Sequence, residues 1–188
     1  MKLVDAVETL NGKVTAKENQ LAAEVAAGLN LPATGETTYQ TLAASNGPNH
    51  VIVPGVQLGA AVDSEPDGQP DPSALGDDND GNDDEDGVSF AVAWIPSQMT
   101  QVNVTTSVDG YLSAWVDFNG DGDFGDPTEQ IAASVPLSAG VNRVHFSVPW
   151  LVEHGQSLAR FRFTSIVGDL PWYGSTIVGG PNDGVEVD

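Results

Sequence analysis

The sequence predicts a mainly β protein, an antiparallel β-sandwich with an N-terminal helical segment. Three observations lead to this prediction. Short runs rich in β-branched and aromatic residues alternate apolar and polar side chains with a period of two. Clusters of Gly, Pro, Asn and Asp separate these runs, as is typical of sandwiches. Good helix formers gather only in about the first 30 residues.

Residues 1–32 form the first predicted unit, a helical segment or linker. The stretch "VDAVETLNGKVTAKENQLAAEVAAGLNL" is rich in Ala, Glu, Leu and Lys, and Thr15 followed by Glu18 has the spacing of a capping box. We expect one or two helices that end near Gly28, because Pro32 follows. Residues 33–188 form the second unit, the sandwich itself.

The strands are predicted from alternation after Pro32. Val102 and Val104 alternate with polar neighbours, and Phe161 and Phe163 alternate with two arginines. The Asp-Gly pair in "VDGY" predicts a two-residue hairpin turn between two strands. The expected strands are residues 50–53, 88–94, 101–108, 111–118, 142–149 and 158–165, and the terminal "GVEVD".

Composition limits the possible partners and chemistry. The 188 residues include 27 acidic and 6 basic ones, so the formal net charge is −21 and nucleic acid or an anionic membrane is a poor partner. The absence of cysteine excludes disulfides, thiolate metal ligands and cysteine catalysis. The N-terminus "MKLVDAVETL" lacks the apolar core of a signal peptide. We therefore expect either a cytosolic protein or, preferably, a segment of a longer exported polypeptide.

The stretch "DFNGDGDFGDPTEQ", residues 117–130, crowds carboxylates together, which is unfavourable without a cation or much water. Its first half matches the calcium-loop pattern D-x-[DN]-x-[DN]-G. The bidentate Glu of a helical calcium loop would fall on Thr128, so either of two later acidic residues could replace it. The candidate ligands are Asp117, Asn119, Asp121, Asp123, Asp126 and Glu129.

Calcium is the metal ion that this ligand set favours. Every ligand is an oxygen, without Cys or paired His, which disfavours zinc and iron, and magnesium would prefer fewer carboxylates and more water. The full prediction is thus a calcium-binding antiparallel β-sandwich. The competing interpretation of the loop is a solvated acidic turn.

Three further acidic segments are candidates for additional calcium ions. They are residues 76–87 and 63–71, which place side-chain oxygens at alternate positions, and residues 182–188, which offer further carboxylates. For residues 76–87 the competing interpretation is a solvated or disordered tract, because a run of like charges usually is one. The candidate ligands in these segments are Asp78, Asp80, Asp83, Asp84 and Asp86, then Asp63 and Glu65, and finally Asp183 and Glu186.

Catalysis is not expected. The three histidines are dispersed, acidic groups are too abundant to single out a pair, and no glycine loop has the pattern that cradles phosphate. Trp94 and Trp115 lie in predicted strands and are expected in the core. Trp172 and Tyr173 stand together in "LPWYGST", where they form either a ligand-binding surface or simple loop packing.

Several motifs resemble one family. The strings "YLSAWVDFNGDGDFGDPTEQI", "VPLSAGVNRVHFSVP" and "ARFRFTS", with the terminal "GVEVD", are similar to the GEVED domain of large secreted bacterial surface proteins and adhesins. The resemblance covers about residues 36–188, although the terminal motif differs from the Gly-Glu-Val-Glu-Asp of the family name. It implies an extracellular, calcium-loaded β-sandwich. The chain also resembles the calcium-dependent peptide-binding module of repeats-in-toxin adhesins.

The resulting functional expectation is a calcium-dependent adhesion module on the bacterial cell surface. Its expected partners are a peptide C-terminus or a glycan on a target surface, together with neighbouring modules of the same polypeptide. The alternative is a structural spacer or filament subunit that calcium makes rigid, with self-association through the N-terminal segment or the final strand. A third possibility is general surface acidity without a specific ion.

Overall fold

The computed structural model describes residues 39–62, 64, 67–70, 87–90, 92–153, 157–168, 170–174 and 185–187. The chain divides into two units, Met1–Leu31 and Pro32–Asp188, and every described residue belongs to the second. The predicted N-terminal helices therefore lie outside the described residues. Within those residues, no helix has the length and apolar character needed to cross a membrane.

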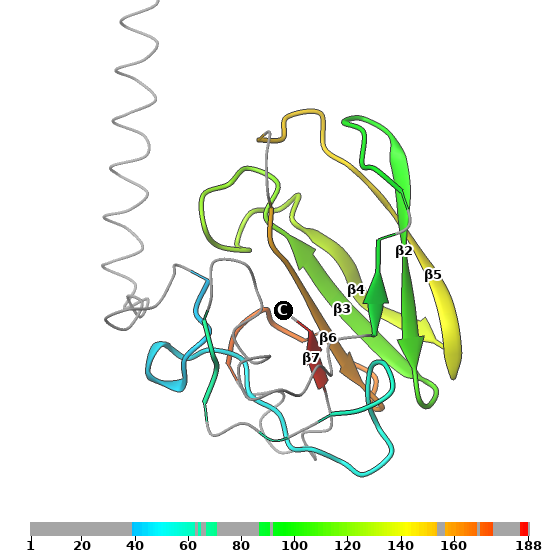
Figure 1. Ribbon diagram of the computed structural model, residues 1–188. Coiled ribbons are helices and arrows are strands. Elements are labelled where there is room, and N and C mark those ends of the chain that lie inside the picture. Colours follow the sequence, from blue (N-terminus) through cyan, green and yellow to red (C-terminus); the bar gives the residue numbers. More distant parts are fainter. Residues whose placement is uncertain are drawn as a thin grey trace, which may run out of the picture. The chain divides into compact units, whose positions relative to one another are not determined.

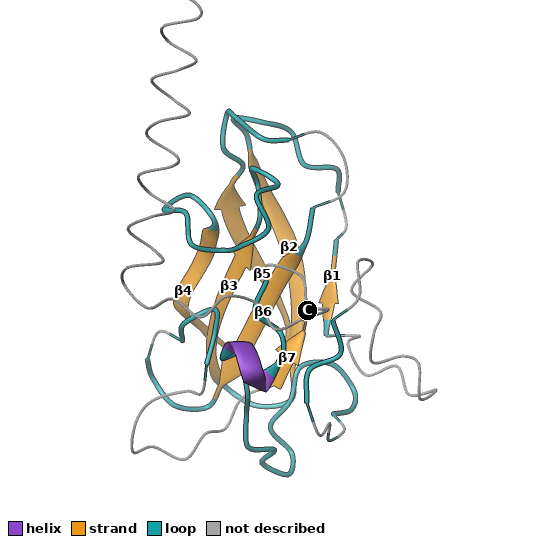
Figure 2. Ribbon diagram, turned by 90° about the vertical axis from the view of Figure 1, so that its left-hand side faces the viewer, coloured by secondary structure: helices purple, strands orange, loops and turns teal. Residues whose placement is uncertain are grey.

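Two antiparallel sheets make up the described part of the chain (Figure 1), which confirms the mainly β prediction. One sheet has the strand order β1-β2-β5 and the other the order β4-β3-β6-β7. A single 3₁₀ turn, η1 (Ala43–Ser45), is the only helical element among the described residues (Figure 2). The strands are β1 (Val88–Ser89), β2 (Met99–Thr106), β3 (Gly110–Val116), β4 (Gln130–Leu137), β5 (Gly140–Ser147), β6 (Ala159–Thr164) and β7 (Val185–Val187).

Both sheets contribute to one apolar core. The predicted alternation in β2 is confirmed, because Val102 and Val104 are fully buried in that core while the intervening polar residues are not. Phe161 and Phe163 of β6 enter the same cluster from the other sheet. Period-two patterning thus gives each sheet one apolar face, and burial of these two faces is the main source of stability.

The other face of β6 is also buried, although it carries charge. Arg160 and Arg162 alternate with the phenylalanines and are 2% and 0% exposed. Arg160 donates hydrogen bonds to the carbonyls of Tyr39 at 3.1 Å and Trp172 at 2.9 Å, and Arg162 donates to the carbonyl of Gly174 at 3.0 Å. These bonds satisfy the buried guanidinium groups and hold two distant loop segments against the sheet.

The predicted "VDGY" hairpin is wrong. β2 pairs with β1 and β5, whereas β3 pairs with β4 and β6, so the chain crosses from one sheet to the other at this turn. Asp109 accepts a hydrogen bond from the backbone N–H of Ala139 at 2.8 Å, and Gly110 lies against the ring of Phe163, where a Cβ atom would come within 2.4 Å of a ring carbon. Asp-Gly serves here for tertiary contacts and close packing instead of a hairpin.

Three strand predictions also need correction. Residues 50–53 form no continuous strand and have only an isolated bridge at Val51, and His50 accepts a hydrogen bond from Arg162 at 3.2 Å. The predicted strand 88–94 ends at Ser89, after which Phe90 and Trp94 contact other rings. β4 was not predicted, because "QIAASVPL" does not alternate regularly. Register shifts interrupt its pairing with β3. Its proline is tolerated because β4 is an edge strand.

Candidate metal centre

The predicted calcium loop is the connection between β3 and β4. Asp117 directly follows the last residue of β3, and Glu129 directly precedes the first residue of β4. The backbone N–H of Val116 donates to the carbonyl of Glu129 at 2.9 Å and closes the base of the loop. The antiparallel pairing of the two strands therefore brings two carboxylates together that are twelve positions apart in the sequence.

Asp117 is the most strongly held acidic residue of the loop. Its side chain is 1% exposed and accepts hydrogen bonds from the N–H groups of Gly120 at 2.6 Å and Gly122 at 3.1 Å. Both glycines have positive φ, 69° and 95°, which lets the backbone fold around the carboxylate. The hydroxyl of Tyr39 donates to Asp117 Oδ2 at 2.6 Å. Burial, and then this bond to Asp117, raises the pKa of Tyr39, so the phenol stays a donor.

Three carboxylates meet at the base of the loop. One oxygen from each of Asp117, Asp121 and Glu129 lies within 4.8 Å of the other two. Asp117 and Glu129 are buried, whereas Asp121 is exposed. Glu129 Oε2 accepts a hydrogen bond from the N–H of Asp126 at 3.1 Å, but Glu129 Oε1 is buried and has no hydrogen-bond partner among the described residues. A buried carboxylate oxygen without a donor is costly unless a cation or a proton compensates it.

The pKa of Glu129 also indicates that its buried negative charge is poorly compensated. The pKa of Glu129 is raised to about 8, chiefly by burial and also by the negative charges of Asp117, Asp121 and Asp126, while the hydrogen bond from the Asp126 backbone acts in the opposite direction. In the cation-free protein Glu129 therefore binds a proton at neutral pH. A divalent cation would displace this proton and remove the repulsion among the three carboxylates.

The other predicted ligands of this loop take supporting positions. Asn119 Nδ2 donates to Asp126 Oδ2 at 2.6 Å and to Asp121 Oδ2 at 3.0 Å, and Asn119 Oδ1 accepts from the N–H of Asp121 at 2.9 Å. Asp123 Oδ1 accepts from the N–H of Gly125 at 2.7 Å. Of the two candidates for the bidentate ligand, the structure brings Glu129 into the cluster, while Asp126 holds Asn119.

The remaining predicted ligands give no second cluster in the described part of the chain. Asp67, which lies in the acidic segment 63–71 but is not itself a predicted ligand, accepts a hydrogen bond from the N–H of Ala43, the first residue of η1, at 2.7 Å. For Glu186 the structure gives only the backbone, in β7. The remaining candidates lie outside the described residues, and their role as ligands stays a prediction; they are Asp63, Glu65, Asp78, Asp80, Asp83, Asp84, Asp86 and Asp183.

The donor set of the cluster fits calcium. It consists of carboxylate oxygens on a loop with left-handed glycines, which suits a hard cation that takes six to eight oxygen ligands. Asp117, Asp121 and Glu129 would hold the ion, and water or a ligand would complete its shell on the exposed side of Asp121.

An aromatic row runs from the loop to the predicted ligand-binding pair. Phe124 of the loop is buried, and its ring centre lies 5.1 Å from that of Tyr39 and 6.0 Å from that of Trp172. Trp172 in turn contacts Tyr173 at 5.0 Å. Trp172 is partly buried in this small second core, while Tyr173 is 39% exposed. Trp172 thus packs against the loop and Tyr173 presents its ring to solvent, and a ligand-binding role for the pair stays a prediction.

Sequence reasoning missed the residues that support the loop from a distance. The N–H of Asp117 donates to the carbonyl of Leu158, Ser157 Oγ donates to the carbonyl of Asp117, and Arg160 lies 5.3 Å above the Phe124 ring. Tyr39 comes from 78 positions earlier in the chain. No local pattern marks these contacts, because they form only when the 39–50 segment lies against the sheet that contains β3 and β6.

No curated protein and no solved structure matches the chain. One family model matches, the GEVED domain, over residues 111–183. The matched range contains the whole 117–129 loop and strands β4, β5 and β6. Residues 111–183, which carry the candidate metal centre, are therefore identified as a GEVED domain, as the resemblance of their motifs had indicated.

Proposed function

We propose that the β3–β4 loop binds one calcium ion and that the protein is a calcium-dependent ligand-binding module of an extracellular bacterial adhesin. The observation that carries the first part is Glu129 Oε1, a buried carboxylate oxygen without a donor that lies in a cluster with Asp117 and Asp121. A calcium ion among these oxygens would give Glu129 a partner and would remove the need for its proton.

Calcium would stabilise more than the loop itself. Asp117 is linked to Tyr39, and Phe124 packs on Tyr39 and Trp172, so ordering the loop also fixes the two segments that cover the outer face of β6. In this proposal the two sheets pack as a β-sandwich, with the calcium loop at one end of the β3–β4 hairpin.

The exposed side of the site supports a ligand-binding role over that of a spacer alone. Asp121 faces solvent, so an ion held by Asp117 and Glu129 would keep coordination positions open on that side. A ligand carboxylate or a vicinal diol could occupy them, and Tyr173 offers an exposed ring at the end of the aromatic row that starts at the loop. A peptide C-terminus or a glycan on a target surface has this chemistry.

The calcium proposal is tested by calorimetry on the full chain after chelation. Calcium is expected to bind and raise the melting temperature, and at about 100 times its Kd to add about 2.7 kcal/mol to the free energy of unfolding. Magnesium at equal concentration is expected to do much less. The variant Glu129→Gln should lose the effect, while Glu153→Gln, the same change at an exposed position beside the loop, should keep it. Equal melting temperatures in calcium and in chelator would overturn the proposal.

The ligand-binding proposal is tested separately. A peptide and glycan array is probed with the wild-type chain and with Tyr173→Ala, each in calcium and in chelator. Binding that requires calcium and weakens in Tyr173→Ala is expected. If calcium stabilises the protein but no array ligand binds, the spacer function replaces the adhesion function while the metal site stands.

A further inference from the structure

The sheet β1-β2-β5 is free of acidic residues in a protein that is otherwise strongly acidic. The chain carries 27 Asp and Glu residues, yet residues 88–108 and 130–152 contain none. These two ranges include all of β1, β2 and β5. The only ionisable side chains on the three strands are Arg143 and His145, and both are exposed. An acid-free surface of this extent stands out against a net charge of −21.

On the outward face of this sheet, β2 and β5 pair in a continuous register, and the side chains are mostly uncharged apart from Arg143. The cross-strand pairs that point away from the core are Met99–Ser147, Gln101–His145, Asn103–Arg143 and Thr105–Val141. Met99 and Val141, at opposite ends of the face, are 64% and 71% exposed. A face with one arginine among uncharged polar and exposed apolar side chains is typical of a surface that another protein covers.

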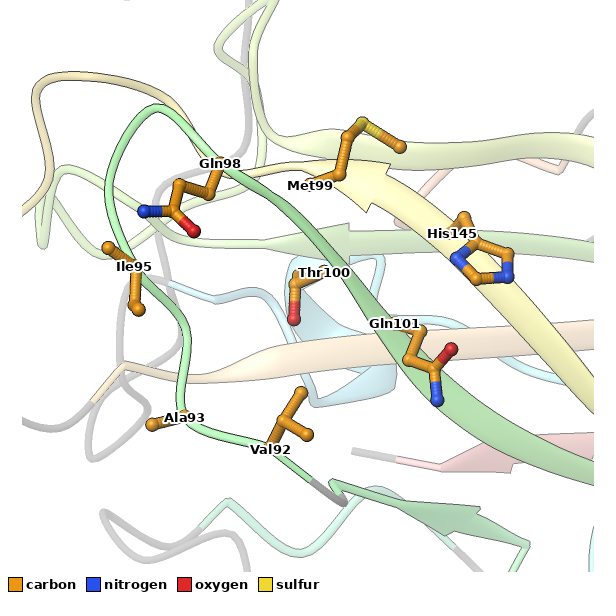
Figure 3. Close-up of a pocket in the computed structure, with 8 residues that line it drawn as sticks. All are labelled: Val92, Ala93, Ile95, Gln98, Met99, Thr100, Gln101 and His145. Atoms are coloured by element: carbon orange, nitrogen blue, oxygen red, sulfur yellow. The ribbon is translucent and has the colours of Figure 1, made fainter.

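A cavity opens beside this face. It has a volume of about 260 Å³ and lies between residues 92–95 and the start of β2, with His145 of β5 at its edge (Figure 3). Val92, Ile95 and Met99 give it apolar walls. Thr100, which also lines it, is 8% exposed, and its hydroxyl has no hydrogen-bond partner among the described residues. A side chain with an apolar body and one donor would fill this cavity well.

Such a side chain is exposed close to the cavity. Trp150 is 78% exposed, and Leu151 beside it is 67% exposed. The segment that carries them is joined to the cavity wall, because the N–H of Val148 donates to the carbonyl of Gln98 at 2.9 Å and the N–H of Ser97 donates to the carbonyl of Val148 at 3.1 Å. We therefore treat the face, the cavity and Trp150 as one surface, here called the neutral surface because it lacks acidic side chains; its one permanently charged group is Arg143.

We propose that the neutral surface binds the same surface of a second copy of this chain, with Trp150 of each copy entering the cavity of the other. The partner is inferred from self-complementarity, because the exposed Trp150 and the apolar cavity belong to the same surface of one chain. Two copies with 21 excess negative charges each repel one another, and the neutral surface is a region where they can approach without placing carboxylates in the contact. A two-fold axis lets one protruding side chain and one cavity per copy satisfy each other.

The contact should be weak and should respond to salt in a characteristic way. Two eight-residue strands give a face about 26 Å long, which is at the small end for a stable interface, so we expect dissociation constants from roughly 10 to 500 µM. Added salt should strengthen association, because it screens the repulsion between the acidic parts of the two copies and between the two Arg143 side chains, while the rest of the contact is uncharged.

Sedimentation velocity on the full chain across that concentration range tests the proposal, at low salt and at about 0.3 M salt. A reversible dimer that strengthens with salt is expected, and Trp150→Ala and Val141→Glu should each shift it to monomer. Val167→Glu is the matched control, since Val167 is 68% exposed but lies in the loop after β6, outside the neutral surface, and it should dimerise like the wild type.

All substituted positions are exposed, so the variants should fold, and their circular dichroism spectra and melting temperatures check this. A monomer under every condition would overturn the proposal. So would a dimer that Trp150→Ala and Val141→Glu leave unchanged, which would place self-association on another part of the chain.

Discussion

The substitution Glu129→Gln should have opposite effects on the protein with and without calcium. The carboxyl of Glu129 has a pKa raised to about 8, from an ordinary value of 4.5, by burial and by neighbouring negative charges. Folding of the calcium-free protein near pH 7.4 must therefore bind a proton at this site, which costs about 4 kcal/mol as an upper limit. Glutamine has nearly the same shape without the charge and still offers an oxygen to the N–H of Asp126.

The sign of the pH dependence follows from the raised pKa. In calcium-free wild type, the contribution of Glu129 to stability is fully present below about pH 4.5, declines as pH rises and is lost above about pH 8. Glu129→Gln should remove this decline, so that near pH 8 the calcium-free variant is more stable than calcium-free wild type by about 2 to 4 kcal/mol. Calcium should narrow this difference, because only the wild type keeps the anionic ligand, and the order should reverse at about 1,000 times the Kd, where binding adds about 4.1 kcal/mol to the wild type.

Urea denaturation followed by circular dichroism measures both effects, at several pH values, with calcium and with chelator. Glu153→Gln controls for the loss of one negative charge near the loop. A Glu129→Gln variant that is less stable than wild type in chelator at pH 8 would refute the reasoning, since it would mean that the carboxylate is compensated without an ion.

Three further predictions concern the loop and its support. Calcium binding near pH 7 should release close to one proton, because Glu129 is mostly protonated there, and titration calorimetry in two buffers of different ionisation enthalpy should show this as a buffer-dependent heat; equal heats would contradict it. Tyr39→Phe should weaken calcium binding roughly tenfold without unfolding the protein, because it removes a hydrogen bond that orients Asp117, and unchanged affinity would rule out that role. Gly110→Ala should lower the free energy of unfolding by about 1 to 3 kcal/mol in urea denaturation, because the added methyl would overlap the ring of Phe163, and full stability would show that the ring can move aside.

Local patterns were sufficient to predict the strands that alternate. β2, β3, β5 and β6 lie within two residues of their predicted bounds, because β-branched and aromatic residues gather in these stretches and, in β2, β5 and β6, apolar side chains alternate with polar ones in sequence. Residues 88–94 contain many apolar side chains, but ring contacts of Phe90 and Trp94 hold that segment outside the ladder. The pairing of strands was not predictable, since the Asp-Gly turn has the local signature of a hairpin and joins two sheets instead.

The candidate metal centre was predictable in composition but not in arrangement. The spacing of Asp117, Asn119 and Asp121 identifies the loop without any structure. Which later acidic residue joins them depends on where β4 begins, and β4 lacks a clear pattern. The selection of Glu129 over Asp126 therefore becomes visible only when the base of the hairpin is in place.

The crossing of the chain between β2 and β3 decides which fragments can fold. A fragment cut to the matched range, residues 111–183, would keep β5 but would lose β1 and β2, the other two strands of the sheet to which β5 belongs. It would also lose Val102, Val104 and Leu58 from the shared core, so β5 and the inner face of β3 would stand in water. The smallest piece able to fold must therefore begin upstream of Leu58, and shorter fragments should be insoluble or unfolded whatever ion is supplied.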